Sequence, residues 1–134
     1  MKEYFLCQVN NNFANLFDDD NLKSLYELYL RSKEDIYYQK QFKTFLRNVD
    51  KESIKEIIDQ KFKVRDDYKQ EGDFYYLKNF ITQNYEILDL KKNYMVIRTD
   101  YEVSPFLNTL SKNFPDLILI DINKYKIARL GLVI

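Results

Sequence analysis

Residues 4–9, Tyr-Phe-Leu-Cys-Gln-Val, and residues 12–17, Asn-Phe-Ala-Asn-Leu-Phe, set the character of this fold. The first run is apolar and typical of a strand. The second begins a helix that places Phe13, Leu16 and Phe17 at i, i+3 and i+4 on one side. Periodicity alone assigns these three side chains to the core. Asparagines open the segment and aspartates close it, so we expect it at the periphery of the fold with at least one ring exposed.

From residue 11 to about residue 65 the spacing of apolar residues is helical. The helix after the first turn repeats apolar residues from Leu22 to Tyr29, and the acidic run that ends at Asn21 supplies its N-cap. Ser32 with Asp35 resembles a capping box for a third helix, and Asp50 caps a fourth. The third and fourth helices have these apolar stripes: Tyr38, Phe42, Phe45, Leu46 and Val49; Ile54, Ile57, Ile58 and Phe62.

From residue 73 onward the pattern changes to strands with one helix among them. Residues 73–79 are one candidate strand, and residues 85–90 and 94–98 flank a hairpin turn at 91–93. Ser104 followed by Pro105 is a helix start. The next strands follow at 117–120, which is apolar throughout and therefore covered on both faces, and at 125–130.

The sequence therefore predicts one domain, residues 1–134, of the α+β class. We expect a mostly antiparallel sheet of about five strands with the helical N-terminal half packed on it. A chain of this length buries roughly two thirds of its unfolded surface without disulfides or metals. Hydrophobic residues make up 46% of the chain and charged residues 31%, which fits a water-soluble globular fold.

The residues that usually carry catalysis are missing. The chain has no His and one Cys, and its two Gly residues cannot form a phosphate-binding loop. Cys7 lies in an apolar strand and has no His to activate it, so we interpret it as a small buried hydrophobe. The aspartates at 18–20 lack the spacing of a calcium loop and are better explained as helix-capping acids. We expect no enzyme activity, no metal and no cofactor.

Charge and the N-terminus limit the partners further. Lys plus Arg equals Asp plus Glu, at 21 each, whereas nucleic-acid-binding domains usually carry a basic surplus. A single Cys suits a reducing compartment, and the N-terminus has no signal-peptide pattern, so we expect a cytoplasmic protein without a membrane anchor. An alternative is a small single-stranded nucleic-acid-binding module that uses exposed tyrosines of an open sheet face as stacking groups: Tyr75, Tyr76, Tyr85 and Tyr94.

One polar helix face remains as a candidate contact surface. On the third helix, Gln41 is aligned with Tyr37, Thr44 and Asn48 at i−4, i+3 and i+7, away from the apolar stripe. Such a face is usually only solvated. The short aromatic segment at 13–17 is the other candidate.

Several of these stretches together resemble a known family, the sporulation inhibitor of replication proteins (SirA). The resemblance starts with Tyr4-Phe5-Leu6, Phe13-Ala14-Asn15-Leu16-Phe17 and Tyr26-Glu27-Leu28-Tyr29. It continues through Lys40-Gln41-Phe42, weakens between residues 44 and 69, and returns at the hairpin and from Ser104 to Tyr125. Order and spacing agree over nearly the whole length.

The resemblance implies that the protein binds domain I of the replication initiator DnaA and inhibits initiation at the chromosomal origin. In the family, the first aromatic of Phe-Ala-Asn, the aromatic four residues later and a Gln on the following helix contact DnaA. These correspond to Phe13, Phe17 and Gln41, with Thr44 as a further candidate; Phe17 stands where the family commonly has Tyr. We expect a monomer before complex formation, with no direct DNA binding, and Leu16 packed inward. A regulatory protein of this fold with another partner is a third possibility.

Overall fold

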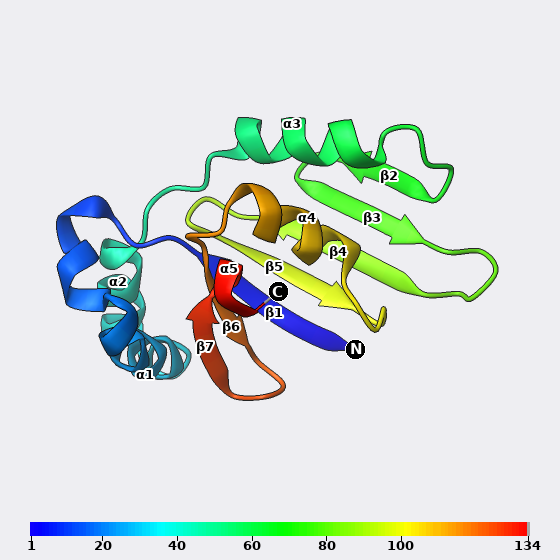
Figure 1. Ribbon diagram of the computed structural model, residues 1–134. Helices are drawn as coiled ribbons and strands as arrows, with labels where there is room; N and C mark the ends of the chain where they lie inside the picture. Colours follow the sequence, from blue (N-terminus) through cyan, green and yellow to red (C-terminus); the bar gives the residue numbers. More distant parts are fainter. Residues whose placement is uncertain (134) are drawn as a thin grey trace.

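Seven strands form one antiparallel sheet in the computed structural model, which describes residues 1–133 (Figure 1). Across the sheet the strands follow the order β2-β3-β4-β5-β1-β6-β7. Their bounds are β1 Lys2–Cys7, β2 Tyr68–Glu71, β3 Phe74–Lys78, β4 Tyr85–Leu90, β5 Tyr94–Thr99, β6 Ile118–Asp121 and β7 Lys126–Arg129.

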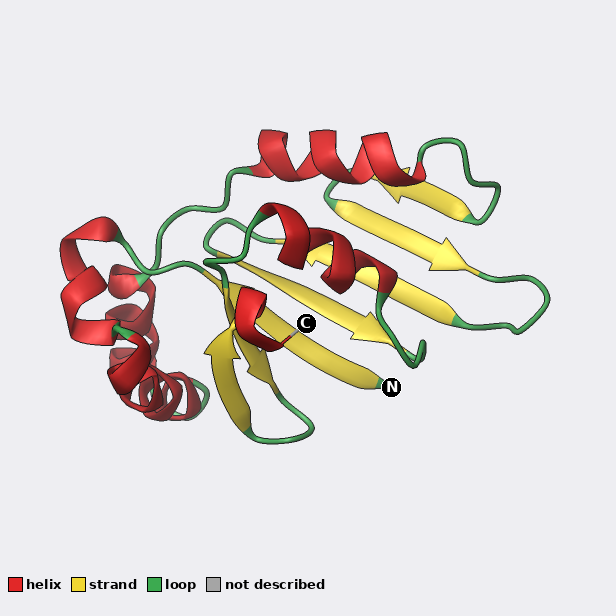
Figure 2. Cartoon of the chain, in the orientation of Figure 1, coloured by secondary structure: helices red, strands yellow, loops and turns green. Residues whose placement is uncertain are grey.

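Helices lie on both faces of this sheet (Figure 2). Two short 3₁₀ helices, η1 Asn11–Phe17 and η2 Asp19–Asn21, follow β1, and five α-helices complete the described chain. Their bounds are α1 Leu22–Ser32, α2 Ile36–Phe45, α3 Lys51–Phe62, α4 Pro105–Asn113 and α5 Leu130–Val133.

Strand β1 lies inside the sheet although it begins the chain. It pairs with β5 on one side and β6 on the other, so that Phe5 is opposite both Val96 and Ile120. Alternate residues of a strand point to opposite faces, and Phe5 and Leu6 are both buried. The apolar sequence of β1 therefore contributes to a core on each face.

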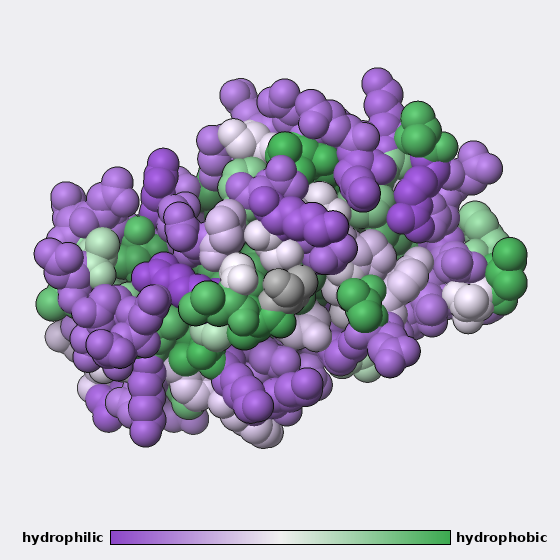
Figure 3. All heavy atoms as spheres, in the orientation of Figure 1, coloured by the Kyte–Doolittle hydropathy of each residue, from purple (hydrophilic) through white to green (hydrophobic). Residues whose placement is uncertain are grey.

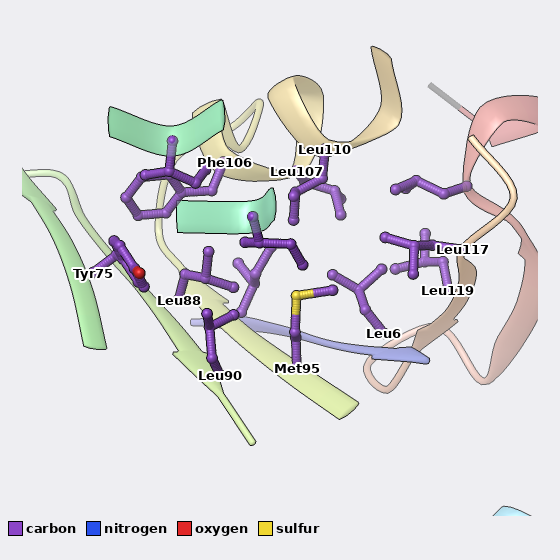
Figure 4. Packing of buried hydrophobic residues seen from close by; sticks show 14 of the residues in the cluster. Leu6, Tyr75, Leu88, Leu90, Met95, Phe106, Leu107, Leu110, Leu117 and Leu119 are labelled. Atoms are coloured by element: carbon purple, nitrogen blue, oxygen red, sulfur yellow. The ribbon is translucent and has the colours of Figure 1, made fainter. Parts of the chain in front are cut away.

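The first core lies between the sheet and α3, α4 and α5 (Figure 4). Leu88, Met95 and Leu6 project from neighbouring strands toward Phe106 and Leu110 of α4. All five side chains are almost fully buried. This core extends across the sheet from β3 to β6.

The second core lies on the opposite face, under η1, α1 and α2. It contains Phe5, Tyr29 and Phe42, whose ring centroids lie 4.8–5.9 Å apart. In Figure 1 these helices cluster at the β1–β6–β7 end of the sheet, and β2 and β3 lie at the other end. The part of this face formed by β2–β4 therefore has no helix over it.

Capping side chains start three of the helices, with two corrections to the expected caps. Asn21 precedes α1 but makes no side-chain capping hydrogen bond, so the acidic run does not cap this helix as expected. Asp50 accepts a hydrogen bond from the Ser53 N–H, and Ser104 accepts one from the Leu107 N–H, as predicted. The expected cap at Ser32 is wrong. Ser32 ends α1 and donates its hydroxyl to the Tyr29 carbonyl, and Asp35 caps α2 by accepting from the Tyr37 N–H.

The predicted α+β class and the antiparallel sheet are confirmed, but the sheet has more strands than expected. Strand β2, Tyr68–Glu71, was not predicted, because its residues Tyr-Lys-Gln-Glu show no apolar alternation. It forms as the outer half of a hairpin with β3. The turn between them contains Gly72 at a φ of +57°, a conformation that glycine adopts without steric cost.

Candidate partner-binding surface

The segment that opens the sequence forms η1, a 3₁₀ helix rather than an α-helix. The Asn10 side chain accepts a hydrogen bond from the Asn12 N–H at 3.0 Å, and the Asn10 carbonyl accepts one from the Phe13 N–H at 2.9 Å. That i to i+3 bond starts a helix with three residues per turn. Hydrogen bonds to Asn10 therefore cap the start of η1.

Burial along η1 differs from the burial expected from the sequence. Phe13 and Phe17 both pack on the Phe45 ring, whereas Ala14 and Leu16 are exposed. Leu16 is 58% exposed and Phe17 only 7% exposed, so the expectation that Leu16 packs inward is wrong. Phe13 is half-buried. The Phe17 ring, expected to meet a partner, is buried in this conformation and leaves Phe13 and Leu16 as the apolar surface of η1.

Phe45 joins η1 to α2. Its ring packs edge-on against Phe13 and Phe17, with centroid distances of 4.9 and 5.1 Å. The Asn10 N–H also donates to the Phe45 carbonyl at 2.8 Å. Since main-chain and ring contacts act together, η1 has a defined position against the end of α2. Sequence reasoning placed Phe45 in the core stripe and missed this joining role.

The outer side of α2 continues this surface. Gln41 precedes Phe45 by four residues and so lies on the same side of α2, and Thr44 follows Gln41 by three residues next to that side. Both are exposed, and the Thr44 hydroxyl donates to the Lys40 carbonyl at 2.9 Å. Asn48 is beyond the end of the helix, where its side chain accepts a hydrogen bond from Asn93.

We call Phe13, Leu16, Gln41 and Thr44 the η1/α2 surface. It combines an apolar part on η1 with a polar part on α2 and contains no ionisable side chain. Three of the four partner-binding residues expected from sequence belong to this surface. The fourth, Phe17, is buried beneath it against Phe45. Leu16 is an addition, because its spacing aligns it with Phe13 but it was expected to pack inward.

Arg129 ties the segment after η1 to the sheet. Its guanidinium forms an ion pair with Asp19 at 2.9 Å and donates to the carbonyls of Asp116 and Phe17. These contacts connect β7 with η1 and η2. The η1/α2 surface is therefore supported both by α2 and by the C-terminal part of the chain.

Burial shifts the pKa values of Cys7 and Glu86. Burial raises the pKa of the Cys7 thiol to about 12, which keeps it protonated and unreactive at neutral pH. Burial also raises the pKa of Glu86, whose Oε2 accepts the Phe106 N–H at the start of α4. Among residues 1–133, no group of three or more Cys, Asp or Glu side chains is arranged to hold a metal ion.

The aromatic residues of the alternative nucleic-acid reading do not share one face. Tyr75 is 1% exposed in the first core, and Tyr94 stacks on Phe5 of the second core at 4.8 Å. Only Tyr76 and Tyr85 lie on the uncovered face, 6.4 Å apart. Two of the lysines near this face are already paired with carboxylates, Lys69 with Glu71 and Lys91 with Asp89. These two lysines would have to give up an ion pair before they could neutralise a phosphate.

The remaining exposed apolar side chains are scattered. The face shown in Figure 3 is mostly polar, with apolar groups around α5 and at the loop between β3 and β4. In that loop Phe80 and Ile81 are 71% and 94% exposed. No helix of the described residues has the length and apolar composition that crossing a bilayer requires.

A scan against protein families and a search of curated proteins find no match to this chain.

Proposed function

We propose that this protein inhibits the initiation of DNA replication by binding domain I of the initiator DnaA through the η1/α2 surface. The proposal rests on the resemblance of residues 4–29, 40–42 and 104–125 to the sporulation inhibitor of replication family. It makes the protein a binding protein rather than an enzyme. Because DnaA acts on the chromosome, it also assigns the protein to the cytoplasm.

The observation that carries the proposal is the contact of Phe13 with Phe45, at a centroid distance of 4.9 Å. This contact unites an aromatic residue of η1 with the helix side that contains Gln41. An apolar anchor beside an uncharged hydrogen-bonding group is typical of a protein-binding surface. Phe13 and Leu16 would fill a pocket on the partner, and Gln41 would fix its orientation.

The buried Phe17 has a supporting role in this proposal. It packs on the same Phe45 ring as Phe13, at 5.1 Å, and so fixes the position of the anchor. The family commonly has Tyr there, and the absence of the hydroxyl suits a ring that is 7% exposed.

The mechanism we infer is occlusion. DnaA domain I self-associates and receives positive regulators, and a protein bound on the same surface excludes both. No chemical step is needed, which agrees with the inert Cys7 thiol.

The test is a calorimetric titration of this protein with DnaA domain I from the same organism. We expect saturable binding, and we expect Phe13→Ala to weaken it about 30- to 1000-fold, the usual cost of truncating an aromatic anchor. Gln41→Ala should weaken it about tenfold, because one hydrogen bond is lost.

Ile36→Ala is the matched control, since Ile36 is an exposed apolar residue at the start of α2, outside the η1/α2 surface. It should bind as the wild type does. If wild-type protein does not bind DnaA domain I, the proposed function is wrong. If Phe13→Ala folds and binds normally, the partner is right but the surface is wrong.

A further inference from the structure

Strand β2 leaves one edge of the sheet open. It is the first strand in the order across the sheet, and among residues 1–133 only β3 pairs with it. A free edge presents unpaired main-chain groups that can receive another strand. Which strand can pair there depends on the outward main-chain groups and on the charges of β2.

The pairing with β3 shows which main-chain groups point outward. The Lys78 N–H donates to the Asp67 carbonyl at 3.0 Å, so residue 67 faces β3. Main-chain direction alternates along a strand, and therefore Lys69 and Glu71 also face β3, whereas Tyr68 and Gln70 face outward. The outward N–H and C=O of Gln70 form the centre of the open edge.

Charges along this edge are self-complementary. Two copies of β2 that pair antiparallel about Gln70 exchange two hydrogen bonds between the two Gln70 residues. That register puts Lys69 of each copy directly opposite Glu71 of the other. Both side chains are exposed and lie on the uncovered face, where Lys69 is opposite Tyr76 and Glu71 opposite Phe74 of β3.

We propose that two copies of this chain associate through β2, in antiparallel register about Gln70. Charged residues on an edge strand usually prevent it from pairing with other strands. A second copy of the order Lys-Gln-Glu is an exception, because antiparallel pairing places opposite charges next to one another. The ion pair between Lys69 and Glu71, 2.6 Å long within one chain, is exchanged for two such pairs between chains. The proposal replaces the expectation of a monomer and does not depend on the partner proposed above.

The dimer would join the uncovered faces of both copies. Phe74 and Tyr76 on β3 stack at 6.2 Å, and Tyr85 follows on β4, so one aromatic row from each copy would flank the new strand pair. The η1/α2 surface lies at the opposite end of the sheet (Figure 1). Both copies of that surface would stay accessible in the dimer.

The test is sedimentation equilibrium of the full chain from about 1 μM to about 500 μM, a range that brackets the affinity of small interfaces. We expect a reversible dimer with a Kd on the order of 10–100 μM for the wild type. Lys69→Glu and Glu71→Lys should each weaken the dimer about tenfold or more, because each places like charges opposite one another. The double exchange, Lys69→Glu with Glu71→Lys, restores complementarity and should restore the dimer.

Lys78→Glu is the matched control. It makes the same charge change on the next strand, away from the residues that meet across the edge, and should leave the dimer intact. Thermal unfolding of each variant verifies that the monomer is folded.

Three outcomes would overturn the proposal. One is a wild type that stays monomeric throughout the concentration range. Another is a double exchange that is as impaired as either single change, since self-pairing requires rescue. The third is a monomer that binds a single-stranded oligonucleotide through Tyr76, which would assign the uncovered face to nucleic acid.

Discussion

The two cores of this protein lie on opposite faces of one sheet and are built from different residues. The first, under α3, α4 and α5, consists mostly of Leu and Ile. The second, under η1, α1 and α2, is rich in Phe and Tyr. Alternate residues of β1 serve both, with Leu6 in the first core and Phe5 in the second.

The two cores differ in the kind of side chain that fills them and in how completely the outermost side chains are buried. Branched aliphatic side chains interdigitate and fill space well. Hollows border both cores, one of about 360 Å³ beside Phe5 of the second and one of about 280 Å³ beside Leu107 of the first. The outer rings of the second core, Phe13 and Phe45, stay half-buried. The first core therefore consists mainly of fully buried aliphatic side chains, whereas the margin of the second exposes parts of two aromatic rings.

The largest loss of stability is expected from a cavity in the first core. Leu88→Ala removes a fully buried side chain between β4 and α4, and we expect it to lower the free energy of unfolding by about 2–5 kcal/mol. Urea unfolding followed by circular dichroism measures this. A loss below about 1 kcal/mol would show that the two cores do not differ as described.

Two alanine substitutions in η1 compare how much a buried and a half-buried ring of the second core contribute to stability. Phe17→Ala should cost about 3 kcal/mol of unfolding free energy, because the ring is buried. Phe13→Ala should cost only about 1 kcal/mol, because the ring is already half in water. The same urea experiment on both variants compares them. Equal losses would contradict the assignment of Phe17 to support and Phe13 to contact.

The pH dependence of stability tests a polar group at the edge of the first core. Burial raises the pKa of Glu86 in the folded protein above its unfolded value, so the folded state binds more protons between the two values. This group makes stability fall as the pH rises through that window and level off above the folded-state pKa.

Glu86→Gln removes the charge and keeps an acceptor for the Phe106 N–H. It should raise the free energy of unfolding at pH 7 by about 1 kcal/mol relative to the wild type and have little effect at pH 4. Urea midpoints measured across this range test it. A wild type whose stability rises through the window relative to Glu86→Gln would contradict the sign.

The smallest expected effect lies at the uncovered end of the sheet. Gly72→Ala meets open space at its Cβ, so its cost comes only from the φ of +57°. We expect about 1 kcal/mol, measured as a shift in the thermal midpoint. A much larger loss would mean that the β2–β3 hairpin contributes to the core rather than extending it.

Much of this fold was predictable because local signals and burial agree. The strand 85–90 and the helix starts at Asp50 and Ser104 were placed correctly, since turn residues, caps and apolar spacing point the same way. Strand β2 was not, because pairing with β3 overrides a sequence with no strand pattern. The cap at Ser32 failed because Asp35 competes for the same role.

The surface proposed for binding was only partly predictable. Gln41 and Thr44 follow from helical spacing on α2. The burial of Phe17 and the exposure of Leu16 do not, because the sequence spacing places both on one side of the segment. Which of the two packs inward depends on the tertiary contact of Phe17 with Phe45, which a pattern of apolar residues does not register.

The place of β1 within the sheet has a consequence for how the chain is made. Strand β1 has neighbours that are synthesised much later, β5 at residues 94–99 and β6 at 118–121. Until then its apolar side chains have no partner strand, and pairs of such large sequence separation form slowly. Pairing of β1 with both neighbours is therefore a late step in folding, and until that step the apolar side chains of β1 are open to non-native contacts.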